Sequence, residues 1–258
     1  MTGRVALVSG GGRGIGAAIA LGLAARGCDV AINYRRDTEA AEKTAQAVRD
    51  LGGRAALVPG SIADPAACAQ IVASAVEQLG GIDILINNAG IASSGRSLAD
   101  TPIEEMHRLM DTHCMGAFAL TQAALPHLRA ARPGHVLFIS STATATLSAG
   151  TGPYTMAKAA IEAMSVVWAK ELCRENIFMN VLGPSLTATE MGFRLARAFT
   201  GVNAIEQLDS QMPFGHVCRP EEVAEAAIFL VSPANSYVSG QRVYVNGGVP
   251  EVDLSAPA

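Results

Sequence analysis

The most regular feature of the chain is an alternation of short apolar runs with longer amphipathic stretches. Runs of four or five residues rich in Val, Ile and Leu predict strands at 5–9, 30–33, 55–58, 84–87, 136–140, 178–182 and 242–245. The stretches between them predict helices at 15–26, 38–51, 65–79, 104–131, 154–174 and 221–230. Strands that alternate with helices are typical of a parallel sheet covered on both faces, so we predict an α/β fold with a seven-stranded sheet.

One segment, 185–217, interrupts this alternation. Its apolar residues are mixed with arginines, glycines and prolines. The chain has no long Pro/Ser linker, internal repeat or low-complexity tract, so we predict a single domain over 1–258. Ligands of α/β sheets bind beyond the carboxyl ends of the strands, and the segment follows a strand. We therefore predict that 185–217 forms a lid over the substrate.

Composition excludes several classes of protein. Half of the 258 residues are hydrophobic and 16% are charged, which excludes disorder for most of the chain. The net charge is −4 and the basic residues are dispersed, so we expect no nucleic-acid partner. The longest uncharged stretch, 136–157, is rich in Ser, Thr and Gly, and we expect no membrane span and a cytoplasmic protein. The five cysteines are widely spaced without a C-x-x-C pair, which predicts neither disulfides nor a metal site.

A glycine-rich turn joins the first predicted strand to the first predicted helix. Its spacing is Gly10-x-x-x-Gly14-x-Gly16. Glycines let the backbone approach a pyrophosphate, and the N–H groups at the start of the helix meet its charge. A tight strand-to-helix connection without a ligand is the alternative interpretation.

The residues after the second predicted strand indicate which dinucleotide binds. Tyr34 stands where an NAD site usually has an acid, and Arg35 and Arg36 follow it. Together with Arg13 in the glycine turn, these guanidinium groups can bind a 2′-phosphate, which favours NADP(H). NAD(H) stays open, because Asp37 lies at the right distance to accept from a ribose, although we interpret it as a helix-entry residue.

Tyr154 and Lys158 open a predicted helix at i, i+4 spacing, so they share one face. A phenol with a pKa of about 10 is a poor acid or base at neutral pH. A neighbouring ammonium stabilises the phenolate, which suits Tyr154 to proton transfer. By itself the pair is also compatible with an ordinary helix surface.

Several motifs in the same order resemble the short-chain dehydrogenase/reductase family. They are the glycine turn, Asn88-Ala89-Gly90, Ser141 thirteen residues before Tyr154, and Tyr154-x-x-x-Lys158. The likeness extends from Val5 to about Pro250. It implies a single Rossmann-type doubly wound domain, a homotetramer or homodimer, and hydride transfer between a nicotinamide and a carbonyl or alcohol carbon.

The resemblance also implies roles for individual residues. Ser141 would orient the substrate oxygen, Tyr154 would be the acid/base, and Lys158 would hold the nicotinamide ribose and lower the pKa of the tyrosine. The residues expected to bind cofactor are Gly10, Arg13, Gly14, Ile15, Gly16, Tyr34, Arg35, Arg36, Ser61, Ile62, Asn88, Ala89, Gly90, Tyr154, Lys158, Pro184 and Thr189.

Three positions depart from the family pattern. His113 stands where the family has an Asn that holds a water on the proton path, so we list His113 as a catalytic candidate; a packed histidine is the alternative. If it relays protons, its titration near 6.5 should limit activity in acid unless burial moves it. Ser61 replaces the acid that meets the adenine, and Ser185 replaces a glycine beside the nicotinamide.

The substrate is the least determined feature. Relatives that reduce 3-oxoacyl carrier proteins use a pair of basic residues, to which Arg132 corresponds here, whereas the other position is Glu175. A carboxylate there would repel an acidic carrier, so we favour a free ketone, with Met191, Phe193 and Phe199 as its apolar contacts. Alternatives are a 3-oxoacyl-carrier-protein or 3-oxoacyl-CoA reductase and an NADP-binding protein without activity. Arg194 and Arg197 could bind a carboxylated or CoA-linked substrate, although solvated charges of the lid are the favoured interpretation.

Overall fold

The computed structural model describes residues 1–131 and 133–248. In these residues seven parallel strands form one sheet in the order β3-β2-β1-β4-β5-β6-β7, which confirms the predicted Rossmann-type architecture. The strands are β1 (Val5–Val8), β2 (Asp29–Tyr34), β3 (Ala55–Pro59), β4 (Ile84–Asn87), β5 (Gly134–Ile139), β6 (Ile177–Pro184) and β7 (Arg242–Val245). Each differs from the predicted range by two residues at most at either end.

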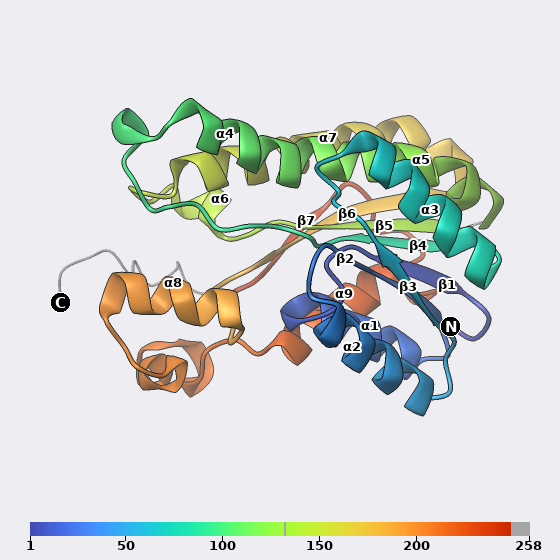
Figure 1. Cartoon of the computed structure of the whole chain (residues 1–258), viewed down its shortest axis with the longest axis horizontal. Coiled ribbons are helices and arrows are strands. Elements are labelled where there is room, and N and C mark those ends of the chain that lie inside the picture. Colours follow the sequence, from blue (N-terminus) through green and yellow to red (C-terminus); the bar gives the residue numbers. More distant parts are fainter. Residues whose placement is uncertain (132, 249–258) are drawn as a thin grey trace.

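Helices cover both faces of the sheet (Figure 1). One layer consists of α1 (Gly14–Ala24), α2 (Thr38–Asp50) and α9 (Pro220–Val231). The other consists of α3 (Pro65–Leu79), α4 (Ile103–Met110), α5 (Gly116–Ala131) and α7 (Gly152–Leu172). The apolar side chains of alternate strand positions are buried against one layer or the other, which is why the strands are apolar at nearly every position.

The strand order reverses its direction at the centre of the sheet. β1 pairs with β2 on one side and with β4 on the other, so that Leu7 lies in register with Ala31 and with Leu85. The connections leave β1 and β4 in opposite directions, and such a reversal is where parallel sheets bind dinucleotides. The glycine turn after β1 and the Asn88 loop after β4 meet at this point.

Two regions differ from the sequence prediction. The range 104–131, predicted as one helix, is divided into α4 and α5 by a π-helical turn, η2 (Asp111–Met115). A short helix, α6 (Ala143–Thr146), follows β5 and was not predicted. Short 3-10 turns also occur at η1 (Leu98–Asp100) and η3 (Cys173–Glu175).

Segment 185–217 contains more regular structure than its sequence indicated. It forms α8 (Glu190–Thr200) and the 3-10 turns η4 (Ile205–Gln211) and η5 (Pro213–Gly215). Ala196, Ile205, Leu208 and Val217 are buried together in a small apolar cluster. In Figure 1 α8 lies outside both helical layers, at the end of the sheet where β6 finishes.

Candidate active site

The glycine turn requires glycine at several positions. Gly10 and Gly14 have φ values of +62° and +54°, in the region that favours glycine. A Cβ atom at Gly16 would lie 2.3 Å from the carbonyl oxygen of Gly10. The Asn88 side chain donates to the carbonyls of Ser9 (3.0 Å) and Gly10 (3.2 Å). The turn after β1 is therefore held against the loop after β4.

The start of α1 fits a bound pyrophosphate. Within the described chain its N-cap residue, Arg13, makes no side-chain capping bond, and the first turn contains no acid. The N–H groups that an acid or a cap would satisfy are thus open to an anion. Ile15 lies in this first turn, and Thr189 at the start of α8 covers Gly14, where a Cβ would lie 3.2 Å from its methyl group.

The arginines expected to meet a 2′-phosphate lie at the end of β2 and in the glycine turn. Arg35 and Arg36 are exposed, and Tyr34 is half-buried. Arg13 pairs with Glu190 of α8 at 2.9 Å and approaches Asp37 at 3.9 Å. Asp37 caps α2 by accepting from the backbone N–H of Ala40 at 3.0 Å, which confirms that it is a helix-entry residue.

The loop after β3 lies on the same edge of the sheet. Asn33 donates to the carbonyl of Gly60 at 3.1 Å and so joins this loop to β2. Ser61 is half-buried and Ile62 is buried. The loop after β4, Ala89 and Gly90, continues the row of strand ends toward Ser141.

Lys158 and Tyr154 lie against the end of β5. Lys158 is 4% exposed, and its Nζ donates to the backbone oxygen of Ile139 at 2.6 Å. The same Nζ lies 5.6 Å from the centroid of the Tyr154 ring. Ser141 follows Ile139 by two residues, and its Oγ accepts from the backbone N–H of Ala143 at 3.2 Å. The structure thus brings the three expected catalytic residues to one strand end.

Burial controls the charge of Lys158. Desolvation lowers its pKa from 10.5 to about 7, and the negative charge of Glu162 opposes this shift. The lysine therefore changes its charge in the neutral range, where small changes in its surroundings alter its protonation.

His113 is placed by the π-helical turn η2 and contacts Tyr154. The two rings meet edge to face with centroids 5.3 Å apart and an interplanar angle of 87°. The imidazole is 3% exposed, and its Nε2 lies 2.8 Å from the carbonyl oxygen and 3.2 Å from the backbone nitrogen of Ile91. Its Nδ1 is buried and has no hydrogen-bond partner within the described chain.

This environment corrects the expected titration of His113. Burial, and then the charge of Lys158, lowers its pKa to about 3, far below the value near 6.5 that we considered from sequence. The ring is therefore neutral at working pH. Because Nε2 faces both a donor and an acceptor of Ile91, either neutral tautomer is satisfied there, and Nδ1 can accept or donate toward the site.

Neighbouring positions make room for this histidine and for a ligand. A Cβ at Gly90 would lie 2.5 Å from Cε1 of His113, so the glycine of the Asn88 loop is needed for the ring. Pro184 is buried at the end of β6, and the Ser185 N–H donates to the carbonyl of Val245 at 3.0 Å. Thr189 caps α8 by accepting from the Gly192 N–H at 3.0 Å.

One buried residue of this region was missed from sequence. Glu162 lies one turn after Lys158 on α7 and is 4% exposed. Its Oε1 accepts from Ser140 at 2.6 Å and lies 2.7 Å from the hydroxyl of Thr144. Its i, i+4 spacing from Lys158 is the sequence signal by which Glu162 could have been identified.

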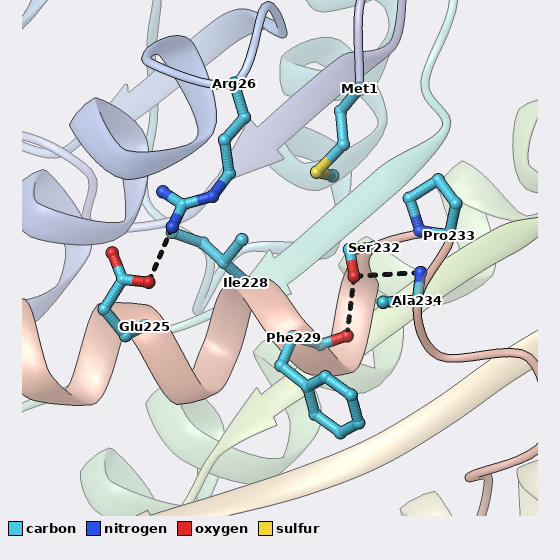
Figure 2. Close-up of a pocket in the computed structure, with 8 residues that line it drawn as sticks. All are labelled: Met1, Arg26, Glu225, Ile228, Phe229, Ser232, Pro233 and Ala234. Atoms are coloured by element: carbon cyan, nitrogen blue, oxygen red, sulfur yellow. Dashed lines mark hydrogen bonds and ion pairs between the residues drawn. The ribbon is translucent and has the colours of Figure 1, made fainter.

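Two surface hollows are lined by none of the catalytic candidates. One, of about 360 Å³, is lined by Met1, Arg26 and residues around the end of α9, and Figure 2 shows its Arg26–Glu225 ion pair. Met1 precedes β1, so this hollow is at the amino ends of the strands, opposite the catalytic candidates. A smaller one, of about 190 Å³, lies between segment 185–217 and the end of β7.

No group of three or more His, Cys, Asp or Glu side chains in residues 1–131 and 133–248 is arranged to hold a metal ion. The helices of the same residues include none that is long and apolar enough to cross a membrane.

Known proteins resemble nearly the whole chain. Residues 10–250 match the family model described as enoyl-(acyl carrier protein) reductase. A chloroplastic NADPH-dependent aldehyde reductase 2 of Arabidopsis thaliana is 33% identical, covering 96% of this chain and 94% of its own. A 3-oxoacyl-[acyl-carrier-protein] reductase of Staphylococcus aureus is 31% identical, covering 95% and 97%.

A solved structure supports the same relationship. The short chain dehydrogenase of Burkholderia cenocepacia in complex with NADP superposes with a TM-score of 0.86 at 32% identity, covering 96% of this chain and 98% of that one. This chain therefore belongs to the short-chain dehydrogenase/reductase family of oxidoreductases.

Proposed function

We propose that this protein is an NADP(H)-dependent oxidoreductase that reduces a ketone or other carbonyl to an alcohol, or catalyses the reverse reaction, with Tyr154 as the acid/base. The observation that supports this most directly is the position of Tyr154. The centroid of its ring lies 5.3 Å from that of His113 and 5.6 Å from Nζ of Lys158, and this Nζ donates to Ile139 at the end of the strand that precedes Ser141.

Each residue of the site has a separate role in the proposed reduction. A bound reduced nicotinamide supplies the hydride that the carbonyl carbon receives. Ser141 donates a hydrogen bond to the carbonyl oxygen, and Tyr154 gives its hydroxyl proton to that oxygen. Lys158, when charged, stabilises the phenolate that remains. His113 can hold a water on the proton path at its Nδ1, which has no partner among the described residues, while Ile91 satisfies Nε2.

The function is tested by separating proton transfer from cofactor binding. Tyr154→Phe removes the hydroxyl alone, so we expect turnover to fall by at least about 1000-fold while the Kd for NADPH changes less than about threefold. Lys158→Ala should lower turnover and also weaken the binding of NADPH. Turnover is followed by NADPH absorbance with a panel of ketones and aldehydes, and undiminished turnover of Tyr154→Phe at saturating cofactor would remove the tyrosine from the mechanism.

The preference for NADP(H) rests on Arg13, Arg35 and Arg36, because NAD(H) has no 2′-phosphate for them to bind. The NADPH-dependent relative and the NADP complex described above support it. We expect NADPH to bind at least about tenfold more tightly than NADH, a difference of about 1.4 kcal/mol. The double variant Tyr34→Asp, Arg35→Asp should reverse the order, because an acid can accept from the ribose hydroxyls. Equal affinities of the unchanged protein for both cofactors would contradict this assignment.

We propose further that segment 185–217 acts as the lid of a single domain. Met191 and Leu195 of α8 are 37% and 43% exposed, and Thr189 already lies over the glycine turn. Phe193 packs in the segment's own cluster and Phe199 is half-buried, so the exposed aliphatic residues are the better candidates for contact with an apolar substrate. This favours a free ketone of small or medium size.

A second candidate, reduction of a 3-oxoacyl group on a carrier protein or on CoA, is favoured by one observation. Glu175, which we expected to repel an acidic carrier, is ion-paired with Arg129. Arg132 lies outside the described residues. The Staphylococcus aureus relative is named as such a reductase. Comparing kcat/KM for a 3-oxoacyl carrier protein, the matching CoA ester and a free ketone distinguishes the candidates.

The remaining expectations are also proposals. A homotetramer or homodimer is checked by analytical ultracentrifugation, and a cytoplasmic location by fractionation of the source cells. Cofactor binding without turnover on any substrate of the panel would favour the non-catalytic alternative.

A further inference from the structure

A carboxylate is buried one helical turn behind the catalytic pair. Glu162 is 4% exposed, and burial of a carboxylate is costly unless charged or hydrogen-bonding groups compensate it. Its partners come from both sides of Ser141. Ser140 donates to Oε1 at 2.6 Å, and the Thr144 hydroxyl lies 2.7 Å from the same oxygen. Glu162 therefore fastens the turn that carries Ser141 to helix α7.

The hydrogen bonds around Thr144 extend this connection to β7. The Thr144 hydroxyl has one proton and lies within reach of Oε1 of Glu162, of the Ser141 carbonyl at 2.9 Å and of the Tyr244 hydroxyl at 3.2 Å. Tyr244 can donate to Thr144 while Thr144 donates to one of the other two. The Nε of Arg242 lies 3.5 Å from Oε2 of Glu162.

Glu162 also faces the catalytic lysine. Residues at i and i+4 are neighbours on one helix face, and Lys158 and Glu162 are both buried on α7. The charged and titratable groups around the two are Tyr154 on α7, His113 on η2, and Arg242 and Tyr244 on β7. None of these four groups is a carboxylate. The negative charge of Glu162 therefore raises the pKa of Lys158, whereas the positive charge of Arg242 acts in the opposite direction.

We propose that Glu162 is a positioning residue of this active site: its carboxylate holds the Ser141 turn against the Tyr154–Lys158 helix and serves as the buried countercharge of Lys158. This proposal rests on the proposed function for its catalytic consequence. The charge relationship exists in the protein without cofactor. The two parts can therefore be tested separately.

The countercharge is measured directly by NMR, because the chain has three lysines: Lys43, Lys158 and Lys170. Lys43 and Lys170 are exposed and serve as internal references. The pKa of each is read from the Cε shifts of the full-length protein, labelled with ¹³C-lysine and free of cofactor. In Glu162→Gln we expect the pKa of Lys158 to fall by about 1 unit below that of the parent, because the amide keeps the shape without the charge.

Matched variants separate the effect of the Glu162 charge on Lys158 from the effect of its hydrogen bonds to the Ser141 turn. Glu171→Gln removes the same charge from an exposed position of α7 and should leave the pKa of Lys158 and turnover unchanged. The double variant Ser140→Ala, Thr144→Val retains Glu162 but removes its donors. It should lower kcat about tenfold or more while the Kd for NADPH stays within about twofold. Glu162→Asp retains the charge, so the pKa of Lys158 should stay closer to the parent value than in Glu162→Gln.

The outcomes distinguish the possible failures. An unchanged pKa of Lys158 in folded Glu162→Gln overturns the countercharge, and parental kcat in the Ser140→Ala, Thr144→Val variant overturns the fastening. If the parent itself turns over no substrate, the proposed function fails, and the lysine titration, which needs no turnover, still decides whether the charge of Glu162 stabilises charged Lys158.

Discussion

His113 shows how one side chain gains a role from its surroundings. The residue type indicated proton transfer with a titration near neutrality, but burial and the nearby ammonium of Lys158 keep the ring neutral, with a pKa of about 3. A neutral imidazole still accepts at one nitrogen and donates at the other. On the proposed function, His113 can thus hold a water on the proton path without imposing an acid limb on the activity profile.

The first prediction at this scale follows from that neutrality. His113→Asn should change turnover by less than about threefold and leave the shape of the activity profile between pH 5.5 and 8 unchanged, because neither side chain titrates there. His113→Phe lacks ring nitrogens and should lose about tenfold or more in kcat if the ring relays protons. The measurement is kcat against pH at saturating NADPH. Equal kcat values for the Phe and Asn variants would make His113 a packing residue.

At the scale of elements, the sequence predicted the strands and the long helices but not the junction between α4 and α5. The seven strands were predicted as short runs rich in Val, Ile and Leu, and the helix that carries Tyr154 and Lys158 as a longer amphipathic stretch. The π-helical turn η2 was missed, since the helical apolar pattern continues through 104–131, and Gly116 directly after the turn does not interrupt it. Yet this turn directs His113 toward Tyr154, and π-turns are frequent at functional sites.

The hydrogen-bond partners of Glu162 could not be predicted from the sequence either. Ser140 and Thr144 precede α7 by many residues, and only the packing of β5, α6 and α7 brings them to one carboxylate. Periodicity reports which face of an element is buried. It does not report which polar side chains from separate elements share an acceptor.

The contact between α8 and the glycine turn gives a prediction at the same scale. Arg13 is paired with Glu190 at 2.9 Å, and both side chains are 59% exposed, so the pair is worth at most about 1 kcal/mol. A 2′-phosphate would compete with Glu190 for Arg13. Glu190→Gln should therefore tighten NADPH binding up to about fivefold and leave NADH binding unchanged.

The control for this prediction is Glu206→Gln, which removes the same charge from an exposed position of η4. Fluorescence titrations at low and high salt measure both affinities. Because screening weakens exposed pairs, the effect should shrink as salt rises. An equal gain for NADPH in Glu190→Gln and Glu206→Gln would indicate a general charge effect and contradict competition for Arg13.

For the whole molecule, the amino ends of the strands carry a second buried histidine that bears on stability alone. His135 at the start of β5 is fully buried, stacks on Phe178 with centroids 5.1 Å apart, and lies 3.2 Å from the Arg4 guanidinium. Burial, and then the charge of Arg4, lowers its pKa to about 4. It lies at the opposite end of the sheet from Tyr154, so its protonation affects folding without touching the site.

The pH dependence of stability follows from these values. The unfolded chain binds a proton at His135 below about pH 6.5, whereas the folded protein binds it only below about pH 4. Between these values the unfolded state carries more protons, so the free energy of unfolding falls on acidification, by about 3 kcal/mol at most for this residue. The stabilisation is fully present above pH 6.5. His113 adds to the loss over the same range.

Urea unfolding at pH 7.5 and pH 5.0 tests this. The parent should lose about 2 kcal/mol through His135 alone between these pH values, since 1.5 pH units below the unfolded pKa correspond to that amount. His135→Gln has no proton to gain, so its stability should be lower than the parent's at pH 7.5, because the Phe178 stacking is lost, but should fall by about 2 kcal/mol less on acidification. His107→Gln, an exposed change on α4, should follow the parent. If the parent and His135→Gln lose the same stability between the two pH values, His135 must already be protonated in the folded protein or exposed to water there.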